Sequence, residues 1–199
     1  MRVAGRCPGC AWREAYEFQR GRGRASLADS LTAAANSWSI TRAFPPEWEN
    51  GCKSCSFWAD NFERVVVHLA HRDVTLVAVS RAPLGKLQSF AKRLGWTFEW
   101  VSSEGSSFNY DFGVSFTPEQ VASGEIPYNF GKHRAYGGEM PGISVFYQDG
   151  AGEIFHTYST YARGLDMLNV AYHYLDIVPK GRDEAAGNMS WLRLRDAYE

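Results

Sequence analysis

The sequence lacks a long hydrophobic run and an excess of charge of either sign. Its most continuous apolar stretch, residues 74–79, is far too short to cross a bilayer, and the first residues lack the long apolar segment of an export signal. The formal net charge is -1 and the Lys and Arg residues are scattered, which argues against binding to nucleic acid or an anionic membrane. We therefore expect a cytoplasmic protein with neither of these partners.

Cysteine is also scarce, because the chain has only 4. They form two CxxC pairs, Cys7 with Cys10 and Cys52 with Cys55. Without an export signal, this pattern argues against a structural disulfide framework and favours metal or redox chemistry. The pairs lie much farther apart than the ~15–20 residues typical of a four-cysteine zinc site, and no set of histidines and carboxylates completes a site. We therefore expect no metal and no cofactor.

The apolar content is sufficient for one folded domain. At 199 residues and 45% hydrophobic composition, the chain suits a single core. Residues 1–25 are rich in Gly and Arg and only weakly periodic, so we expect a poorly ordered lead-in with one short strand near residues 16–19. Residues 26–180 should form the domain, and residues 181–199 a mostly polar tail that packs loosely at the surface.

Hydrophobic periodicity predicts alternating helices and strands. Residues 56–69 carry apolar side chains at helical spacing, and residues 74–79 form the continuous run of a parallel strand covered on both faces. A helix over residues 83–94 should end at Gly95, followed by a strand over residues 97–102.

The second half of the chain is less regular. Residues 105–138 are expected to be a turn-rich, irregular stretch, and residues 143–147 and 153–158 to form an antiparallel hairpin. An amphipathic helix is expected over residues 165–175.

The second cysteine pair stands where a loop rich in Pro and charge gives way to a helix. A helix N-terminus favours the thiolate form of cysteine, the form that reacts. An unperturbed cysteine with a pKa near 8.5 is only about 3% thiolate at pH 7, and a change of about 2 kcal/mol makes it about half ionised. The helix dipole and the neighbouring Lys53 together could supply that change.

The order of these elements resembles the thioredoxin fold, in which a CxxC opens the first core helix and a cis-proline before the third core strand faces the dithiol. More closely, the chain resembles the bacterial thioredoxin-like domain-of-unknown-function family 899. The segments that carry this resemblance are residues 51–62 (GCKSCSFWADNF), 68–75, 79–83, 95–98, 108–114 (FNYDFGV) and 141–147 (PGISVFY). The resemblance implies an α/β fold of three layers, α/β/α, around a central mixed sheet.

The resemblance also implies a site. We predict a thiol-disulfide oxidoreductase in which Cys52 attacks a protein or small-molecule disulfide and Cys55 resolves the mixed disulfide. Pro141, the match to the cis-proline, would shape the substrate groove. Trp48, Lys53 and Ser54 are the other groove candidates. Asp60, on the same helix, is a candidate proton acceptor for Cys55, and a surface carboxylate is the alternative.

Two other functions stay open, and the oligomeric state is not predicted. One is a redox-inert thioredoxin-like module that binds a partner. The other is a thiol peroxidase, because peroxiredoxins resemble Pro-x-x-x-Thr-x-x-Cys and Pro45 and Cys52 have that spacing. Glu49 stands at the threonine position, which removes the hydroxyl that would orient a peroxide and adds a negative charge. The fold also needs a strand just before Cys52, and residues 37–44 are a poor candidate for it.

Overall fold

The computed structural model describes residues 11–31, 36–41 and 43–198. The first cysteine pair, Cys7 and Cys10, lies outside the described residues. Among the helices that are described, none is long and apolar enough to cross a membrane.

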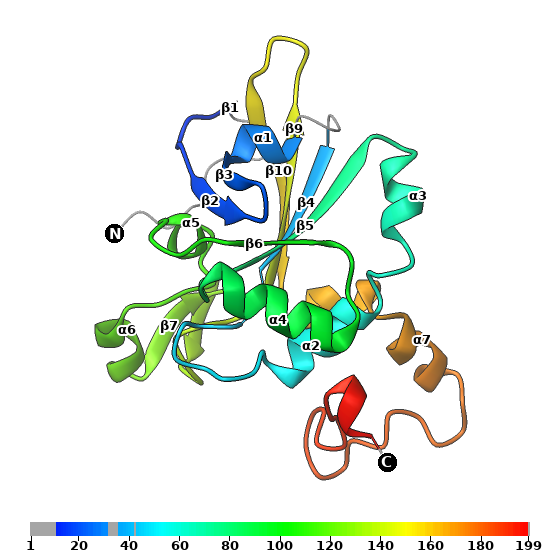
Figure 1. The fold of residues 1–199 in the computed structure, drawn as a ribbon. Helices are drawn as coiled ribbons and strands as arrows, with labels where there is room; N and C mark the ends of the chain where they lie inside the picture. The colour runs from blue at the N-terminus through cyan, green and yellow to red at the C-terminus, as the bar shows by residue number, and fades with distance from the viewer. Residues whose placement is uncertain (1–10, 32–35, 42, 199) are drawn as a thin grey trace.

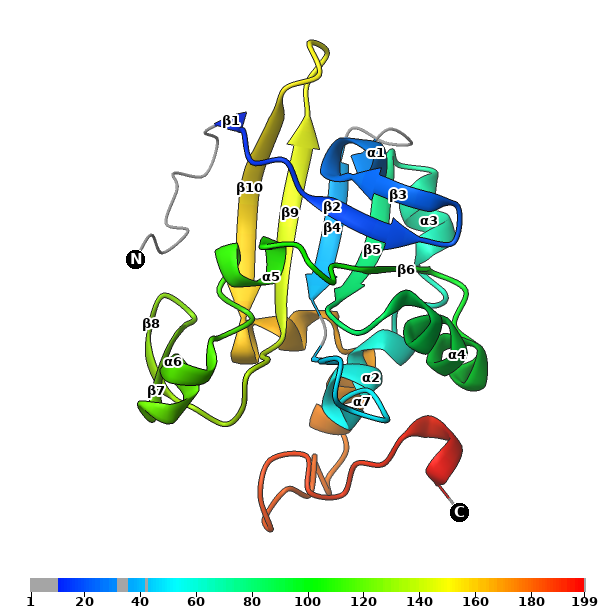
Figure 2. The same cartoon turned by 60° about the vertical axis from the view of Figure 1, so that its left-hand side comes forward.

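An eight-stranded mixed sheet forms the centre of the molecule (Figures 1 and 2). The strand order is β1-β10-β9-β4-β5-β6-β2-β3. Strands β4, β5 and β6 are parallel, and β9 runs antiparallel to β4. The strands are β1 Ala11–Trp12, β2 Glu17–Arg20, β3 Gly23–Ser26, β4 Asn36–Thr41, β5 Val74–Ser80, β6 Glu99–Ser102, β9 Gly142–Gln148 and β10 Ile154–Tyr161.

Helices cover both faces of this sheet, and a small hairpin lies beside it. The helices are α1 Leu27–Leu31, α2 Lys53–Asp60, α3 Val66–Ala70, α4 Leu84–Leu94, α5 Phe108–Asp111, α6 Pro118–Ala122 and α7 Val170–Asp176, with 3-10 turns η1 Ala162–Leu168 and η2 Arg195–Ala197. The hairpin is β7 Glu125–Tyr128 and β8 Gly131–Arg134.

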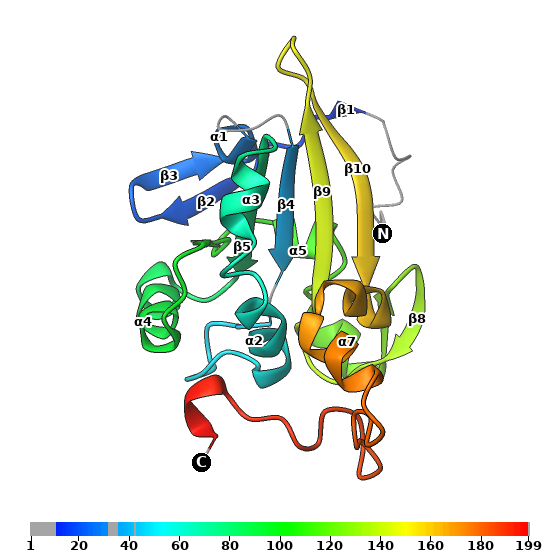
Figure 3. The same cartoon turned by 90° about the vertical axis from the view of Figure 1, so that its right-hand side faces the viewer.

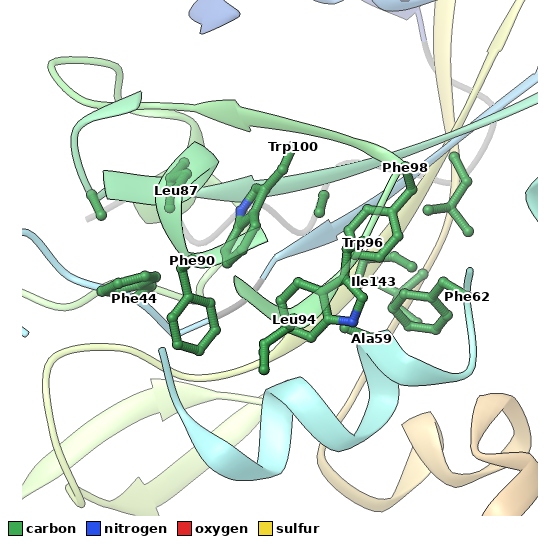
Figure 4. Packing of buried hydrophobic residues seen from close by; sticks show 14 of the residues in the cluster. Phe44, Ala59, Phe62, Leu87, Phe90, Leu94, Trp96, Phe98, Trp100 and Ile143 are labelled. Atoms are coloured by element: carbon green, nitrogen blue, oxygen red, sulfur yellow. The ribbon is translucent and has the colours of Figure 1, made fainter. Parts of the chain in front are cut away.

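Strand β5 shows why the molecule has three layers. Its side chains alternate between two cores, with Leu76 and Ala78 on one face and Val77 and Val79 on the other. The first core packs against α2, α3 and α4, and Figure 4 shows its aromatic side chains between α2 and the sheet. The second core packs against α1 and α5. A strand buried on both faces carries mostly apolar side chains on both of them, so the run at residues 74–79 indicated the centre of the sheet.

The most regular predictions are confirmed. The expected hairpin is β9 and β10, and the expected helix over residues 83–94 is α4. Gly95 ends α4 with a φ of 65°, a left-handed conformation that glycine adopts at little cost.

The expected weak strand before Cys52 is β4, and it lies at the centre of the sheet. Parallel β5 pairs with it on one side and antiparallel β9 on the other, over all six of its residues. Ile40 is buried in the first core. Strands on both sides satisfy the backbone of β4, so tertiary pairing replaces the strong apolar pattern that the sequence lacks here.

Two predicted helices are each broken. The helix expected over residues 56–69 is α2 and α3 separated by turns, because Asn61 donates from Nδ2 to the carbonyl of Phe57 (2.7 Å). The backbone of Asn61 bonds instead to Trp58, one residue closer than in an α-helix. The helix expected over residues 165–175 is η1 followed by α7, and Asn169 caps α7 by accepting from the Tyr172 N–H (3.3 Å).

Three segments are more ordered than the sequence indicates. The described part of the expected lead-in, residues 11–25, lies in three strands of the sheet and the connections between them, and the third strand extends to Ser26. The stretch at residues 105–138 holds α5, α6 and the β7–β8 hairpin, and Thr117, Pro118 and Gln120 form a capping box that the sequence could have revealed. The tail runs along the bottom of the view in Figure 3, below α2 and α7. Its Leu192 is buried to 1% exposure against side chains of these two helices.

Candidate functional site

The loop before Cys52 is held closely against the first core. The Cys52 N–H donates to the Ala43 carbonyl (3.2 Å). Lys86, from α4, donates from Nζ to the carbonyls of Pro46 (2.8 Å) and Trp48 (2.7 Å). A Cβ on Gly51 would lie 3.1 Å from the Phe90 ring, so only glycine fits there without a shift. These contacts fix the place where α2 begins.

Cys52 caps the N-terminus of α2, as the sequence indicates. Its Sγ accepts a hydrogen bond from the backbone N–H of Cys55 at 3.5 Å. Cys52 is partly exposed, whereas Cys55 is 6% exposed, and both are reduced. A sulfur that accepts an N–H at the positive end of a helix dipole is favoured as thiolate. The partly exposed, capping sulfur is therefore the better nucleophile of the two.

Both cysteines face a pocket of about 170 Å³ between α2, the start of β9 and η1. Trp48, Ser54 and Pro141 line it with them, so the structure brings together these predicted groove residues. The remaining lining is mostly apolar and comes from Ile40, Ala43, Trp58, Phe62, Glu139, Met140, Gly142, Ile143 and Leu165.

Pro141 lies where the resemblance places it, but the Met140–Pro141 peptide bond is not cis. The expected cis bond is therefore wrong, in keeping with the preference of about 0.5–1 kcal/mol for trans X-Pro bonds. The Tyr128 hydroxyl donates to the Pro141 carbonyl (2.6 Å) and accepts from the Ala162 N–H (2.8 Å). Tyr128 thus anchors this wall of the pocket without a cis peptide.

The pocket contains one carboxylate that the sequence analysis missed. The side chain of Glu139 is 3% exposed, and it accepts hydrogen bonds from Arg81 Nη1 (2.7 Å) and Ser115 Oγ (2.8 Å). Burial raises the pKa of the Glu139 carboxyl above its usual range, against the opposing effect of those two hydrogen bonds. The signal was available, because Glu139 stands only two residues before the predicted groove proline.

Two predicted residues point elsewhere. Lys53 is exposed and donates from Nζ to the Leu192 carbonyl of the tail (3.0 Å). Asp60, at the far end of α2, accepts from Trp96 Nε1 (2.8 Å) and lies 3.6 Å from Arg195. Neither lines the pocket. Glu139, and not Asp60, therefore lines the pocket together with the cysteines.

Metal binding finds no support in the part of the chain that the structure covers. Over those residues, no group of three or more His, Cys, Asp or Glu side chains is placed to hold an ion. The pair Cys7 and Cys10 falls outside this statement.

Sequence comparison supplies the family. The sequence model of a bacterial protein family of unknown function, DUF899, matches residues 5–198. The chain belongs to this family. No match is found among curated proteins.

Solved structures with a similar fold are peroxiredoxins. Xanthomonas campestris Peroxiredoxin Q superposes with a TM-score of 0.52 at 14% identity, over 81% of this chain and 95% of that chain. A cysteine-to-serine mutant of PrxQ from Xylella fastidiosa superposes with a TM-score of 0.52 at 17% identity, over 87% of this chain and 98% of that chain. Peroxidoxin BcpB from Mycobacterium tuberculosis superposes with a TM-score of 0.50 at 15% identity, over 84% of this chain and 97% of that chain. At these identities the likeness shows the fold alone, so this DUF899 member has a thioredoxin-like fold.

Proposed function

We propose that this DUF899 protein is a thiol-disulfide oxidoreductase whose redox pair is Cys52 and Cys55. The observation that carries the proposal is the Cys52 sulfur at the cap of α2, which accepts the Cys55 N–H and faces the pocket. This environment favours a reactive thiolate next to a second thiol. The proposal includes a cytoplasmic location, where the pair would be kept reduced.

The reaction has two steps. The Cys52 thiolate attacks a disulfide R–S–S–R, forming a mixed disulfide and releasing one RS⁻. The Cys55 thiol then loses its proton and attacks the Cys52 sulfur, which forms the Cys52–Cys55 disulfide and releases the second RS⁻. Two electrons pass from the protein to the substrate, and a cellular dithiol must later reduce the protein again.

The pocket gives the substrate its orientation. Pro141, Trp48 and Ser54 border the sulfur atoms, and apolar side chains form most of the remaining wall. Trp48 is 40% exposed, so the rim of the pocket offers an aromatic surface to a protein or small-molecule disulfide. Lys53 lies on the tail side of α2, so we no longer propose it for the groove.

A thiol peroxidase is the second candidate, and the peroxiredoxin-like fold favours it. Pro45 and Cys52 keep the spacing of the peroxiredoxin motif, but an exposed Glu49 stands in the place of its threonine. In this reaction Cys52 would attack a peroxide ROOH, and the O–O bond would break to give a sulfenic acid on Cys52 and ROH. The Cys55 thiol would then condense with the sulfenic acid to form the disulfide and release water. Both reactions end in the same intramolecular disulfide, so the substrate alone distinguishes them.

Reduction of insulin disulfides with dithiothreitol as reductant tests the first candidate. We expect turnover by the wild type, none above background by Cys52→Ser, and a trapped mixed disulfide with Cys55→Ser. The double variant Cys7→Ser/Cys10→Ser is the matched control and should retain wild-type turnover. Equal rates for wild type and Cys52→Ser would reject the proposal. Consumption of hydrogen peroxide or cumene hydroperoxide in place of insulin would select the peroxidase.

A further inference from the structure

The carboxylate of Glu139 is built rigidly into the wall of the cysteine pocket. Residues 138–140 are pinned to residues 114–116 by two backbone hydrogen bonds, from Phe116 N to Gly138 O (2.9 Å) and from Met140 N to Val114 O (2.8 Å). Ser115 and Glu139 face each other in the same short bridge. The backbone therefore fixes the carboxylate before any substrate enters.

Arg81 orients the carboxylate from the other side. It follows β5 and donates to one Glu139 oxygen, while Ser115 donates to the other. The guanidinium also lies 4.8 Å above the ring of Tyr110, on α5. With each oxygen held by one donor, each keeps a lone pair for a further proton.

The pocket brings this carboxylate to the reacting sulfur atoms. Glu139, Cys52 and Cys55 line the same space of about 170 Å³, which is large enough to hold water. A proton can therefore pass between Cys55 and Glu139 within the pocket, as general acid–base chemistry requires. Most of the other lining side chains are apolar and accept no proton.

Few other charges face this group. Arg81 forms an ion pair with Glu139. The negative charge of Glu47, an exposed residue of the loop before α2, raises the pKa of both Arg81 and Glu139. The thiols of Cys52 and Cys55 lie at the start of α2. Tyr128 of β7 interacts electrostatically with Cys55, but burial raises the pKa of its hydroxyl above the usual range of tyrosine, so it stays protonated near pH 7. Tyr110 of α5 contacts Arg81. Glu139 is thus the carboxylate that lines the pocket together with the two thiols.

We infer that Glu139 is the proton acceptor for Cys55 and that Arg81 is the residue that positions it. This inference rests on the proposed function. In the resolving step, the Cys55 S–H bond breaks, its proton moves to Glu139, and the Cys55–Cys52 bond forms as the Cys52–substrate bond breaks. The protonated Glu139 then gives its proton to the departing RS⁻, which leaves as RSH and restores the carboxylate.

Reaction with DTNB separates the two steps when it is carried out on the Cys7→Ser/Cys10→Ser protein, which keeps only the thiols of Cys52 and Cys55 and serves as wild type in this test. Attack by Cys52 releases the first thionitrobenzoate, and attack by Cys55 on the mixed disulfide releases the second. For Glu139→Gln we expect a first phase within a few-fold of wild type and a second phase slowed about 100-fold or more, the usual contribution of a general base. Between pH 6 and 8 the variant's second phase should rise about tenfold per pH unit, because solvent hydroxide replaces the carboxylate, whereas the wild-type dependence should be shallower.

Asp60→Asn is the matched control, because it removes a carboxylate that lies on α2 but does not line the pocket. We expect both of its phases to match wild type. If Glu139→Gln fails to fold because Arg81 is left unpaired, the neutral pair Arg81→Met/Glu139→Gln takes its place, with the same slow second phase expected. Wild-type rates and pH dependence in the second phase of the folded variant would overturn the inference and leave the proposed function intact. A wild type that releases only one equivalent would overturn both.

Discussion

The two ends of α2 lie in opposite surroundings. At the N-terminal end, Cys52 and Cys55 face an apolar pocket with one buried carboxylate, Glu139. At the C-terminal end, Asp60 is bound by Trp96 and lies near Arg195. The side chains of Phe57 and Trp58 pack against a separate cluster of Tyr172, Met189 and Leu192.

The difference shows how one short helix serves two purposes. Its C-terminal half is packed between the aromatic core in Figure 4 and the tail, and so it anchors the helix. Its N-terminal half keeps two sulfur atoms at a pocket, where few polar groups compete with the substrate. If the cysteines react as proposed, we expect local order at the anchored end to preorganise the end that carries them, the reactive end.

The largest effect is expected from loosening the anchored end through Leu192→Ala. This side chain is 1% exposed beneath α2, so its truncation should lower the free energy of unfolding by about 2–5 kcal/mol. Urea denaturation measures the change. Ile177→Ala is the matched control, because Ile177 is 80% exposed in the same part of the chain and should change stability by less than about 0.5 kcal/mol. Similar losses in both variants would mean that the tail does not anchor α2.

A smaller effect is expected from crowding the reactive end through Gly142→Ala. A Cβ there would lie 2.7 Å from Val114 Cγ1 and 2.9 Å from the ring of Tyr161, so these side chains or the start of β9 must shift. We expect a loss of about 1–3 kcal/mol in unfolding free energy and slower insulin reduction, because Pro141 moves with β9. Gly137→Ala is the control, since a Cβ at that position would meet no neighbour within 4 Å in the described part of the chain. Wild-type stability and turnover in Gly142→Ala would contradict the prediction.

The smallest effect is an acid-dependent loosening of the anchored end. Hydrogen bonds from Arg182 lower the pKa of Asp176, and those from Arg93 lower the pKa of Asp196. A carboxyl whose pKa is lower in the folded state stabilises the fold above its unfolded pKa of about 3.9, and this contribution is lost as the pH falls through the folded value. The melting temperature of Asp176→Asn/Asp196→Asn should therefore depend less steeply on pH below about 4 than that of wild type. If the melting temperatures of the variant and wild type fall in parallel with pH, these exposed ion pairs contribute nothing measurable to stability.

The sequence was sufficient where one local signal decided the structure. The apolar run at residues 74–79 predicted β5, and Gly95 predicted the end of α4. Resemblance to the family added the meeting of Cys52 and Pro141, which the pocket lining now supports. The breaks at Asn61 and Asn169 were missed because each depends on a side chain bonding to a backbone group that helical periodicity does not report.

By itself, the sequence predicted the α/β class, the place of Cys52 at the start of α2 and the closeness of the Cys52 and Cys55 thiols, because each follows from residues close together in the chain. Only the tertiary structure decided which carboxylate lines the pocket with the sulfur atoms. Arg81 and Glu139 are 58 residues apart, and they meet because β5 and the loop before β9 converge at the same end of the sheet. It also decided that the tail covers α2, since burial of Leu192 depends on partners distant in the chain.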